Sequence, residues 1–432
     1  MDAADLAPVP DARRTQPPFD LFLIFLAANV VATTLQTGAA LGERLGGTAA
    51  LVVTIAGAAI GALLVALLAP VGSSSGVPSM IAARAPLGTR GAQLVSAVLF
   101  VTNFAWIAIN NQIAASACAA VLGGPSSLQL WSAFLGIAST AVVAAGPRAV
   151  GVADRVAVPV MALAGLALTY AALTHPAPSA PLAPLAPSAP LAPLAPLAPA
   201  APLAPMSWGL DVVIGYQVSW LLMFADYSRY TRSGRSAAVA VWAGLALPAF
   251  WLMPLGFKLA QLANSSDPGA MLGVLGQGWW TAALITLASV TTNFVNIYMS
   301  GLAWRTLSAR STGTGTVWTI GLIGTALGLA SSGWLSQFAD LMMWLGSVLV
   351  PVGGVFLAHF FVMRRTIDAS TIYDASRVPS VNVAGLVAWA SGFLAYKLAA
   401  SVGATLPALA TTIVVYVVLS RGRGAVVTQN SH

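Results

Sequence analysis

The chain has 432 residues, of which 58% are hydrophobic and only 7% are charged, and its mean hydropathy is +0.84. Soluble globular domains carry about 25% charged residues, so this composition excludes a soluble domain and predicts an all-α polytopic membrane protein. The net charge of +7 does not indicate a nucleic-acid partner, because most of the 19 basic residues fall in segments on one predicted side of the bilayer.

Apolar stretches of about 20 residues, long enough to cross a hydrocarbon core of about 30 Å, recur along the chain. They predict about twelve transmembrane helices, at 19–41, 48–70, 92–122, 128–145, 155–175, 207–225, 236–262, 278–304, 315–332, 338–363, 382–400 and 403–420. Residues 1–18 are polar and contain proline, which predicts a tail and not a cleaved signal peptide. The charge asymmetry places the protein in the cytoplasmic membrane, with both termini in the cytoplasm.

Residues 176–206 repeat Pro-Leu-Ala and Pro-Ser-Ala units, and proline at every third or fourth position cannot continue a helix. We therefore expect an extended external linker there. The linker separates two five-helix repeats, at 19–175 and 207–363, and residues 364–432 hold two peripheral helices and the C-terminal tail. Transporters built from inverted repeats place broken helices at the start of each half, with the binding site between them.

The polar residues inside the apolar spans are mainly amides and hydroxyls, in clusters at 33–37, 110–112 and 291–296. Polar groups are costly in hydrocarbon unless they face a cavity, a partner helix or a ligand. Trp106 and Asn110 share one helix face, where a ring stacked on the indole would gain about 1–3 kcal/mol. The pattern therefore suits a neutral, flat solute that forms hydrogen bonds.

Small polar residues and glycine predict that the first span unwinds over 33–38, and Gly215-Tyr216-Gln217 predicts a break in the middle of the sixth span. Both breaks would border the site. The candidate substrate-binding residues are therefore Trp106, Asn110, Gln36, Tyr216, Gln217, Asn293 and Asn296.

Other candidates have two interpretations. Thr291 and Thr292 could bond to their own helix carbonyls, or they could give a hard cation its oxygen ligands. Asp226 beside Arg229 predicts a salt bridge that gates the cytoplasmic side.

Carboxylates are scarce in the middle of the spans, which favours sodium over a proton as the coupling ion. The sequence has a single cysteine, no metal-ligand spacing and no nucleophile–base set, so we expect neither an enzyme nor a cofactor.

Four motifs, in this order, carry a family resemblance: Gly76-Val77-Pro78-Ser79-Met80 with Arg84; Trp106; Asp226-Tyr227-Ser228-Arg229-Tyr230; and Thr291-Thr292-Asn293 through Asn296-Ile297-Tyr298. They resemble the nucleobase:cation symporter-1 family, which includes cytosine permeases and hydantoin and allantoin transporters. The resemblance covers most of residues 19–310. Two departures concern the substrate: Tyr216-Gln217 stands where a second tryptophan is common, and the amide at Asn296 is offset by one residue.

The resemblance implies a LeuT-like fold, with a 5+5 inverted repeat plus two peripheral helices. It implies that the cation ligands are the backbone carbonyls of Ala32, Leu35 and Ala288 and the hydroxyls of Thr291 and Thr292. We therefore expect a monomeric secondary-active symporter in the lipid bilayer. It would import a nucleobase or related heterocycle (cytosine, purine or hydantoin type) with Na+ or H+ by alternating access. An amino-acid or organic-cation transporter of the same fold, a channel and a membrane enzyme are the alternatives.

Overall fold

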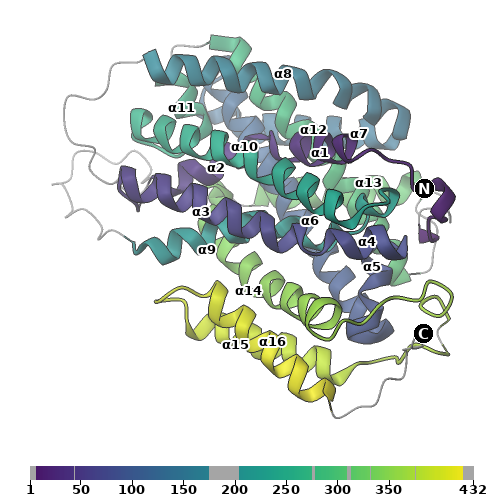
Figure 1. Ribbon diagram of the computed structural model, residues 1–432. Helices are drawn as coiled ribbons and strands as arrows, with labels where there is room; N and C mark the ends of the chain where they lie inside the picture. Colours follow the sequence, from purple (N-terminus) through teal and green to yellow (C-terminus); the bar gives the residue numbers. More distant parts are fainter. Residues whose placement is uncertain are drawn as a thin grey trace.

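The computed structural model describes residues 6–42, 44–174, 204–274, 278–308, 313–330, 332–374 and 376–421, and all regular secondary structure in these ranges is helical. Figure 1 shows the helices as one bundle. They are α1 (Pro18–Asn29), α2 (Ala32–Leu41), α3 (Gly47–Ala66), α4 (Ala69–Ser75), α5 (Ser79–Ala82), α6 (Arg84–Leu122), α7 (Leu128–Ala144), α8 (Pro147–Thr174), α9 (Met206–Gln217), α10 (Gly234–Ala263), α11 (Pro268–Val274), α12 (Gly278–Ser308), α13 (Thr314–Ala330), α14 (Phe338–Leu357), α15 (Val383–Leu398) and α16 (Thr405–Arg421). The predicted linker at 176–206 lies almost wholly outside the described residues.

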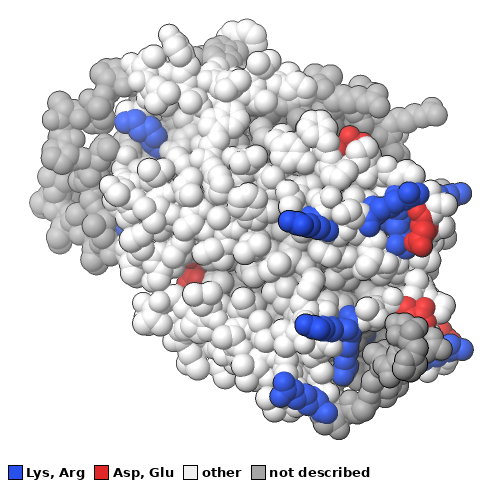
Figure 2. Space-filling model, viewed as in Figure 1, with Lys and Arg blue, Asp and Glu red and all other residues white. Residues whose placement is uncertain are grey.

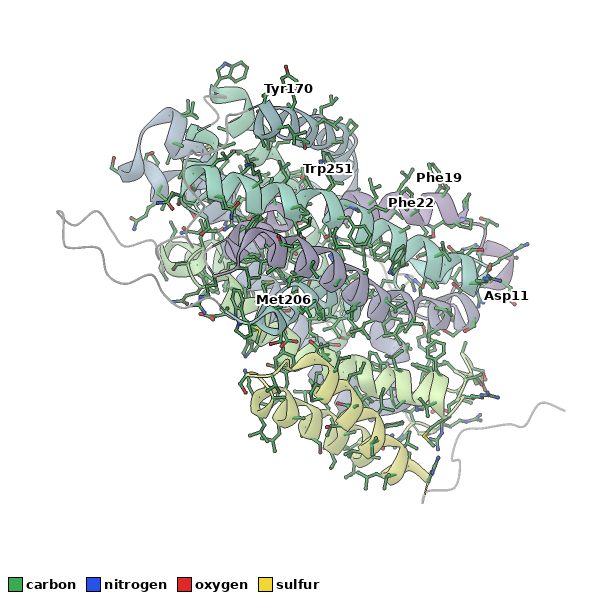
Figure 3. The ribbon with its side chains drawn as sticks, turned by 60° about the vertical axis from the view of Figure 1, so that its left-hand side comes forward. Asp11, Phe19, Phe22, Tyr170, Met206 and Trp251 are labelled. Carbon is green, nitrogen blue, oxygen red and sulfur yellow. The ribbon has the colours of Figure 1, made fainter. Side chains whose placement is uncertain are left out.

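Membrane-spanning character is clear in several of these helices. Within the described residues, four segments are long and apolar enough to cross a bilayer: Gly47–Ser75, Arg84–Leu122, Gly234–Ala263 and Phe338–Val362. The bent pair α1 and α2 would add a fifth if it forms one span. Large apolar side chains face outward, among them Phe19 and Tyr170, which are 65% and 72% exposed (Figure 3). An apolar exterior of this kind suits lipid contact. The total of about twelve spans stays a prediction.

Residues 6–16 form a strap across one end of the bundle, which we call the N-terminal face. Arg14 donates from Nη1 to the carbonyl oxygen of Ser73 at 3.0 Å, and the Tyr373 hydroxyl donates to the carbonyl oxygen of Leu6 at 2.6 Å. Burial raises the pKa of Tyr373 to about 12, so this hydroxyl stays protonated at neutral pH. Lys and Arg side chains gather at this end (Figure 2), as the predicted cytoplasmic side requires.

The two last helices, α15 and α16, lie at the edge of the bundle against α14 (Figure 1, yellow). Asp211, on α9, fixes the start of α16 at the face opposite the strap. Its carboxylate accepts hydrogen bonds from the backbone N–H of Ala404 (2.6 Å), from that of Thr405 (3.0 Å) and from the Thr405 hydroxyl (2.7 Å). A side chain of the core thereby caps a peripheral helix.

The first span is broken, but not where the sequence predicted. α1 and α2 meet at an angle of 54° across Val30 and Val31, whereas residues 33–38 are helical. The prediction of an unwound 33–38 segment is therefore wrong. The hydroxyl of Thr37 bonds to the carbonyl of Thr33 (2.8 Å), within the helix. The hydrogen-bonding capacity of that hydroxyl as a donor is therefore met within α2.

Glycines in α2 and α10 allow these two helices to pack backbone against backbone. A Cβ on Gly38 would overlap the carbonyl group of Met253, and one on Gly256 would overlap that of Leu35. Gly38 is therefore required for close approach and does not mark a flexible point.

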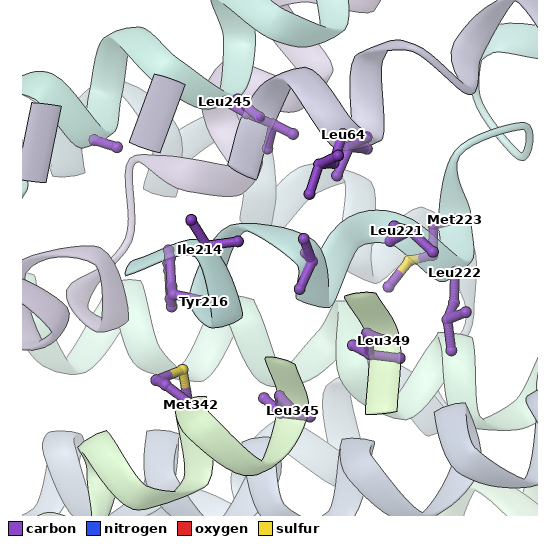
Figure 4. Close-up of a cluster of buried hydrophobic side chains, with 14 of the residues drawn as sticks. Leu64, Ile214, Tyr216, Leu221, Leu222, Met223, Leu245, Met342, Leu345 and Leu349 are labelled. Carbon is purple, nitrogen blue, oxygen red and sulfur yellow. The ribbon is translucent and has the colours of Figure 1, made fainter. Parts of the chain in front are cut away.

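The sixth span also departs from a regular α-helix, but directly after the predicted place, because residues 215–217 are still α-helical. α9 ends at Gln217 and continues as a 3₁₀ helix, Val218–Met223, which is tighter than an α-helix. Figure 4 shows this element between two layers of buried side chains, with Leu64 and Leu245 on one side and Met342, Leu345 and Leu349 on the other.

Candidate functional site

A cavity of about 310 Å³ lies between the two broken helices and is walled by α1, α6, α9, α12 and α14. This volume falls within the range of small-molecule sites. No charged side chain lines it in the described part of the chain. Its polar and aromatic lining residues are Phe25, Thr33, Thr102, Asn103, Trp106, Tyr216, Ser219, Trp220, Tyr227, Thr291, Thr292 and Asn296. The lining therefore suits a neutral ligand that has an aromatic face and hydrogen-bonding edges.

Trp106 stands at the centre of α6 and forms part of the cavity wall. Its indole makes edge-on contacts with Tyr216 (ring centroids 6.0 Å apart) and Phe338 (6.4 Å). Those partners belong to α9 and α14, so three helices fix the orientation of the indole. A tryptophan held in this way can present a rigid surface to a ring.

Tyr216 joins the two broken helices. Its hydroxyl lies 2.6 Å from the Thr34 hydroxyl and 3.2 Å from that of Thr33. The Thr34 hydroxyl also donates to the carbonyl oxygen of Asn29 at 2.7 Å, across the break between α1 and α2. The hydroxyls thus connect the break in the first span to the end of α9, at the wall of the cavity.

Five of the predicted site residues line the cavity: Trp106, Tyr216, Asn296, Thr291 and Thr292. The Thr292 hydroxyl donates to the carbonyl oxygen of Ala288 at 2.8 Å, and the Thr291 hydroxyl lies 3.1 Å from the same oxygen. A hydroxyl oxygen that donates its proton keeps two lone pairs, so this geometry is compatible with both interpretations of the threonines.

Four predicted substrate residues do not line the cavity, namely Gln36, Asn110, Gln217 and Asn293. Their amides donate to other acceptors. Gln36 donates to the carbonyl oxygen of Ser266 (3.0 Å) and Asn110 to that of Trp106 (2.9 Å). Gln217 donates to the carbonyl oxygen of Leu245 (3.3 Å) and Asn293 to the side-chain oxygen of Asn111 (2.8 Å). All four are buried, and a buried amide pairs with the nearest acceptor that its helix packing provides. In this conformation their hydrogen bonds go to other protein groups, and their role in binding substrate stays a prediction.

The three predicted backbone cation ligands are also outside the cavity lining. Ala32 is the first residue of α2, and the carbonyl of Leu35 lies against Gly256 of α10. The carbonyl oxygen of Ala288 already accepts the threonine hydroxyl of Thr292. The structure therefore brings only the two threonines of the predicted cation set to the cavity.

The predicted gating pair lies at the N-terminal face, with Asp226 directly before and Arg229 two residues after the cavity-lining Tyr227. Arg229 donates from Nε to the backbone carbonyl of Asp226 at 3.3 Å and from Nη1 to the carbonyl oxygen of Ala7 in the strap at 3.1 Å. The pair is therefore placed where the cavity approaches this face, and its gating role stays a prediction.

Two functional or structural residues were missed in the sequence. Asn103 is 2% exposed and lines the cavity three residues before Trp106, a spacing that puts both on one helix face and could have identified it. Asp211, also 2% exposed, is a buried carboxylate in the sixth predicted span. The expectation of few intramembrane carboxylates overlooked it.

A comparison with known families finds that the family described as a permease for cytosine/purines, uracil, thiamine and allantoin matches residues 8–418. The match extends beyond the 19–310 segment in which the resemblance was noted. The cytosine permease of Escherichia coli (strain K12) is 24% identical over 391 residues, which cover 90% of this chain and 87% of the permease.

Solved structures show the same architecture. Mhp1, a nucleobase-cation-symport-1 family transporter, matches in its closed conformation with bromovinylhydantoin bound (TM-score 0.78, 18% identity, 98% of this chain and 95% of that chain). Its inward-facing conformation gives a TM-score of 0.80 at 17% identity, covering 97% and 92%. A Na+-coupled sialic acid symporter gives 0.59 at 11% identity, covering 98% and 93%. These similarities confirm the predicted LeuT-like all-α fold.

Proposed function

This chain belongs to the permease family for cytosine/purines, uracil, thiamine and allantoin, and from that premise we propose that it is a symporter for a neutral planar heterocycle of the nucleobase type. The observation that carries the proposal is the cavity wall at Trp106. Stacking of a ring on an aromatic side chain contributes about 1–3 kcal/mol. A charged substrate would lose its hydration without gaining a counter-charge, because no charged side chain among the described residues lines the cavity.

The coupling ion in this proposal is sodium. Thr291 and Thr292 line the same cavity as Thr33, so neutral oxygens of α12 and α2 border one space. Hard cations take oxygen ligands of this kind, whereas a proton relay usually needs an intramembrane carboxylate or histidine. Asp211 is such a carboxylate, but it caps α16, and no carboxylate or histidine among the described residues lines the cavity. A cation held between α12 and the first span would favour the state that binds substrate, and substrate would raise the cation affinity by the same factor.

The transport direction in this proposal is import, with the N-terminal face in the cytoplasm. The lining residues Phe25 of α1 and Met223 and Tyr227 beyond α9 lie towards that face, on the side where the strap and the arginines are. A cavity displaced to this side is what the release state of an alternating-access importer requires.

The test is uptake into proteoliposomes that contain the purified protein. We expect saturable accumulation of at least one of labelled cytosine, uracil, hypoxanthine or hydantoin under an inward sodium gradient, and not when choline replaces sodium. A pH gradient alone should not drive it. Accumulation of an amino acid or an organic cation, with no uptake of any ring, would contradict the proposal.

A further inference from the structure

Three hydroxyls and one carbonyl form a chain of hydrogen bonds across the break in the first span. The Tyr216 hydroxyl lies between those of Thr33 (3.2 Å) and Thr34 (2.6 Å). The Thr34 hydroxyl in turn donates to the carbonyl oxygen of Asn29 at 2.7 Å. All four residues are 3% exposed or less. Because a hydroxyl has only one proton, the direction of each hydrogen bond in this chain can be worked out.

The direction is set at Asn29, the last residue of α1. Its carbonyl oxygen can only accept, and the last carbonyls of a helix have no partner inside that helix. The other acceptor near the Thr34 hydroxyl, at 3.3 Å, is the side-chain oxygen of the same asparagine. The single proton of Thr34 therefore points to Asn29. The Tyr216 hydroxyl must then donate to Thr34, and the Thr33 hydroxyl must donate to Tyr216.

This direction leaves the lone pairs of the Thr33 oxygen without a donor. No other group in the described part of the chain donates to that oxygen. Thr33 lines the cavity together with Thr291 and Thr292 of α12, and α2 contacts α12 directly. An oxygen whose proton is already held away from the cavity is ready to bind a cation, because no free energy is spent on turning it.

The ring of Tyr216 has a different contact from its hydroxyl. It meets the indole of Trp106 edge-on, with ring centroids 6.0 Å apart. Phenylalanine at this position would keep the ring and remove only the hydroxyl. The two parts of the side chain can therefore be separated by one substitution.

We propose that Tyr216 is a positioning residue: its hydroxyl holds the proton of Thr33 away from the coupling cation, so that Thr33 is a third hydroxyl ligand beside Thr291 and Thr292. The inference rests on the proposed function, in which that cation is sodium. The family resemblance implies only backbone ligands from the first span. A side-chain ligand from that span, oriented by the sixth, is a different arrangement.

The experiment measures two quantities on the purified full chain. The first is the sodium chloride concentration that gives half of the rise in melting temperature, with choline chloride keeping the ionic strength constant. The second is the dissociation constant, in choline alone, of the tightest binder among cytosine, uracil, hypoxanthine and hydantoin. In Tyr216→Phe the sodium midpoint should rise about tenfold, and the dissociation constant should change less than about twofold.

Thr33→Val tests whether Tyr216 acts through Thr33. It should raise the sodium midpoint about as much as Tyr216→Phe does, and the double variant should be no weaker than either single one, because both changes remove the same ligand. The control is Tyr416→Phe, which removes a buried hydroxyl that lies 2.7 Å from Nδ1 of His359 and outside the cavity lining. It should leave the sodium midpoint unchanged.

An unaltered midpoint in Tyr216→Phe, or additive effects of the two substitutions, would overturn the inference and leave the proposed function standing. Equal weakening of sodium and ring binding would indicate a merely structural role and overturn it too. If Tyr216→Phe does not fold, Thr33→Val decides alone, and an unaltered midpoint there overturns the inference. A wild type that responds to sodium no more than to choline would overturn the sodium part of the proposed function as well.

Discussion

Replacement of Asp211 should lower the stability of the protein without changing the cavity, because this buried carboxylate does not line it. Its two oxygens accept three hydrogen bonds from the first residues of α16 and the residue before it. Hydrogen bonds to charged groups contribute about 1.5–3 kcal/mol each, but bonds that share one carboxylate are not additive. Alanine at a helix N-cap costs about 0.5–2 kcal/mol, and stranded donors add to that. We expect Asp211→Ala to cost about 3 kcal/mol.

Asp211→Asn separates the hydrogen bond from Ala404 from the two hydrogen bonds from Thr405. Its remaining oxygen can still accept both bonds from Thr405, whereas the new amide group faces the N–H of Ala404, so we expect a cost of about 2 kcal/mol. The assay is thermal unfolding in detergent with hydrogen–deuterium exchange of the first turn of α16. That turn should exchange faster in both variants, while Asp340→Asn, at an exposed acidic residue, should behave as wild type. Unchanged melting and exchange in Asp211→Ala would refute this reasoning.

Three further predictions concern other parts of the molecule. Replacing both Thr291 and Thr292 by valine should raise the sodium concentration for half-maximal uptake at least tenfold, and unaltered sodium dependence would exclude the threonines as ligands. Gly38→Ala should abolish uptake or folding, because its Cβ would overlap a backbone carbonyl of α10; full uptake by a stable variant would contradict that packing. Arg14→Ala should expose the strap, residues 6–16, to protease at the N-terminal face, whereas the exposed Arg13→Ala should not; equal cleavage would argue against the strap contacts.

The fold was predictable because apolar length and charge asymmetry are properties of whole segments. The position of the first break was not, because the sequence signal was ambiguous. Glycine and threonine at 33–38 are typical of unwound segments, yet here Gly38 serves close packing against α10 and Thr37 bonds within its own helix. The actual break, at Val30 and Val31, carries no glycine or proline.

The candidate site was only partly predictable, because the sequence does not show how each helix is rotated. Helices that are apolar on nearly every side give no periodic signal for the face that meets the cavity. Trp106 was identified because tryptophan in the middle of a span is unusual, and Asn296 because it stood in a polar cluster. Asn110 and Gln36 looked equivalent in sequence, but their amides pair with backbone carbonyls and do not line the cavity. Which amide pairs with a carbonyl and which stays unpaired depends on helix rotation.

The central claim is that an uncharged ring stacks on Trp106, and the most direct measurement is the dissociation constant of the tightest-binding ring for wild type and Trp106→Ala. Loss of about 1–3 kcal/mol of stacking should weaken binding about 5- to 150-fold. Trp279→Ala, at a tryptophan that is 72% exposed and outside the cavity lining, should bind as wild type. A folded Trp106→Ala variant that binds the ring as tightly as the wild type would contradict the account.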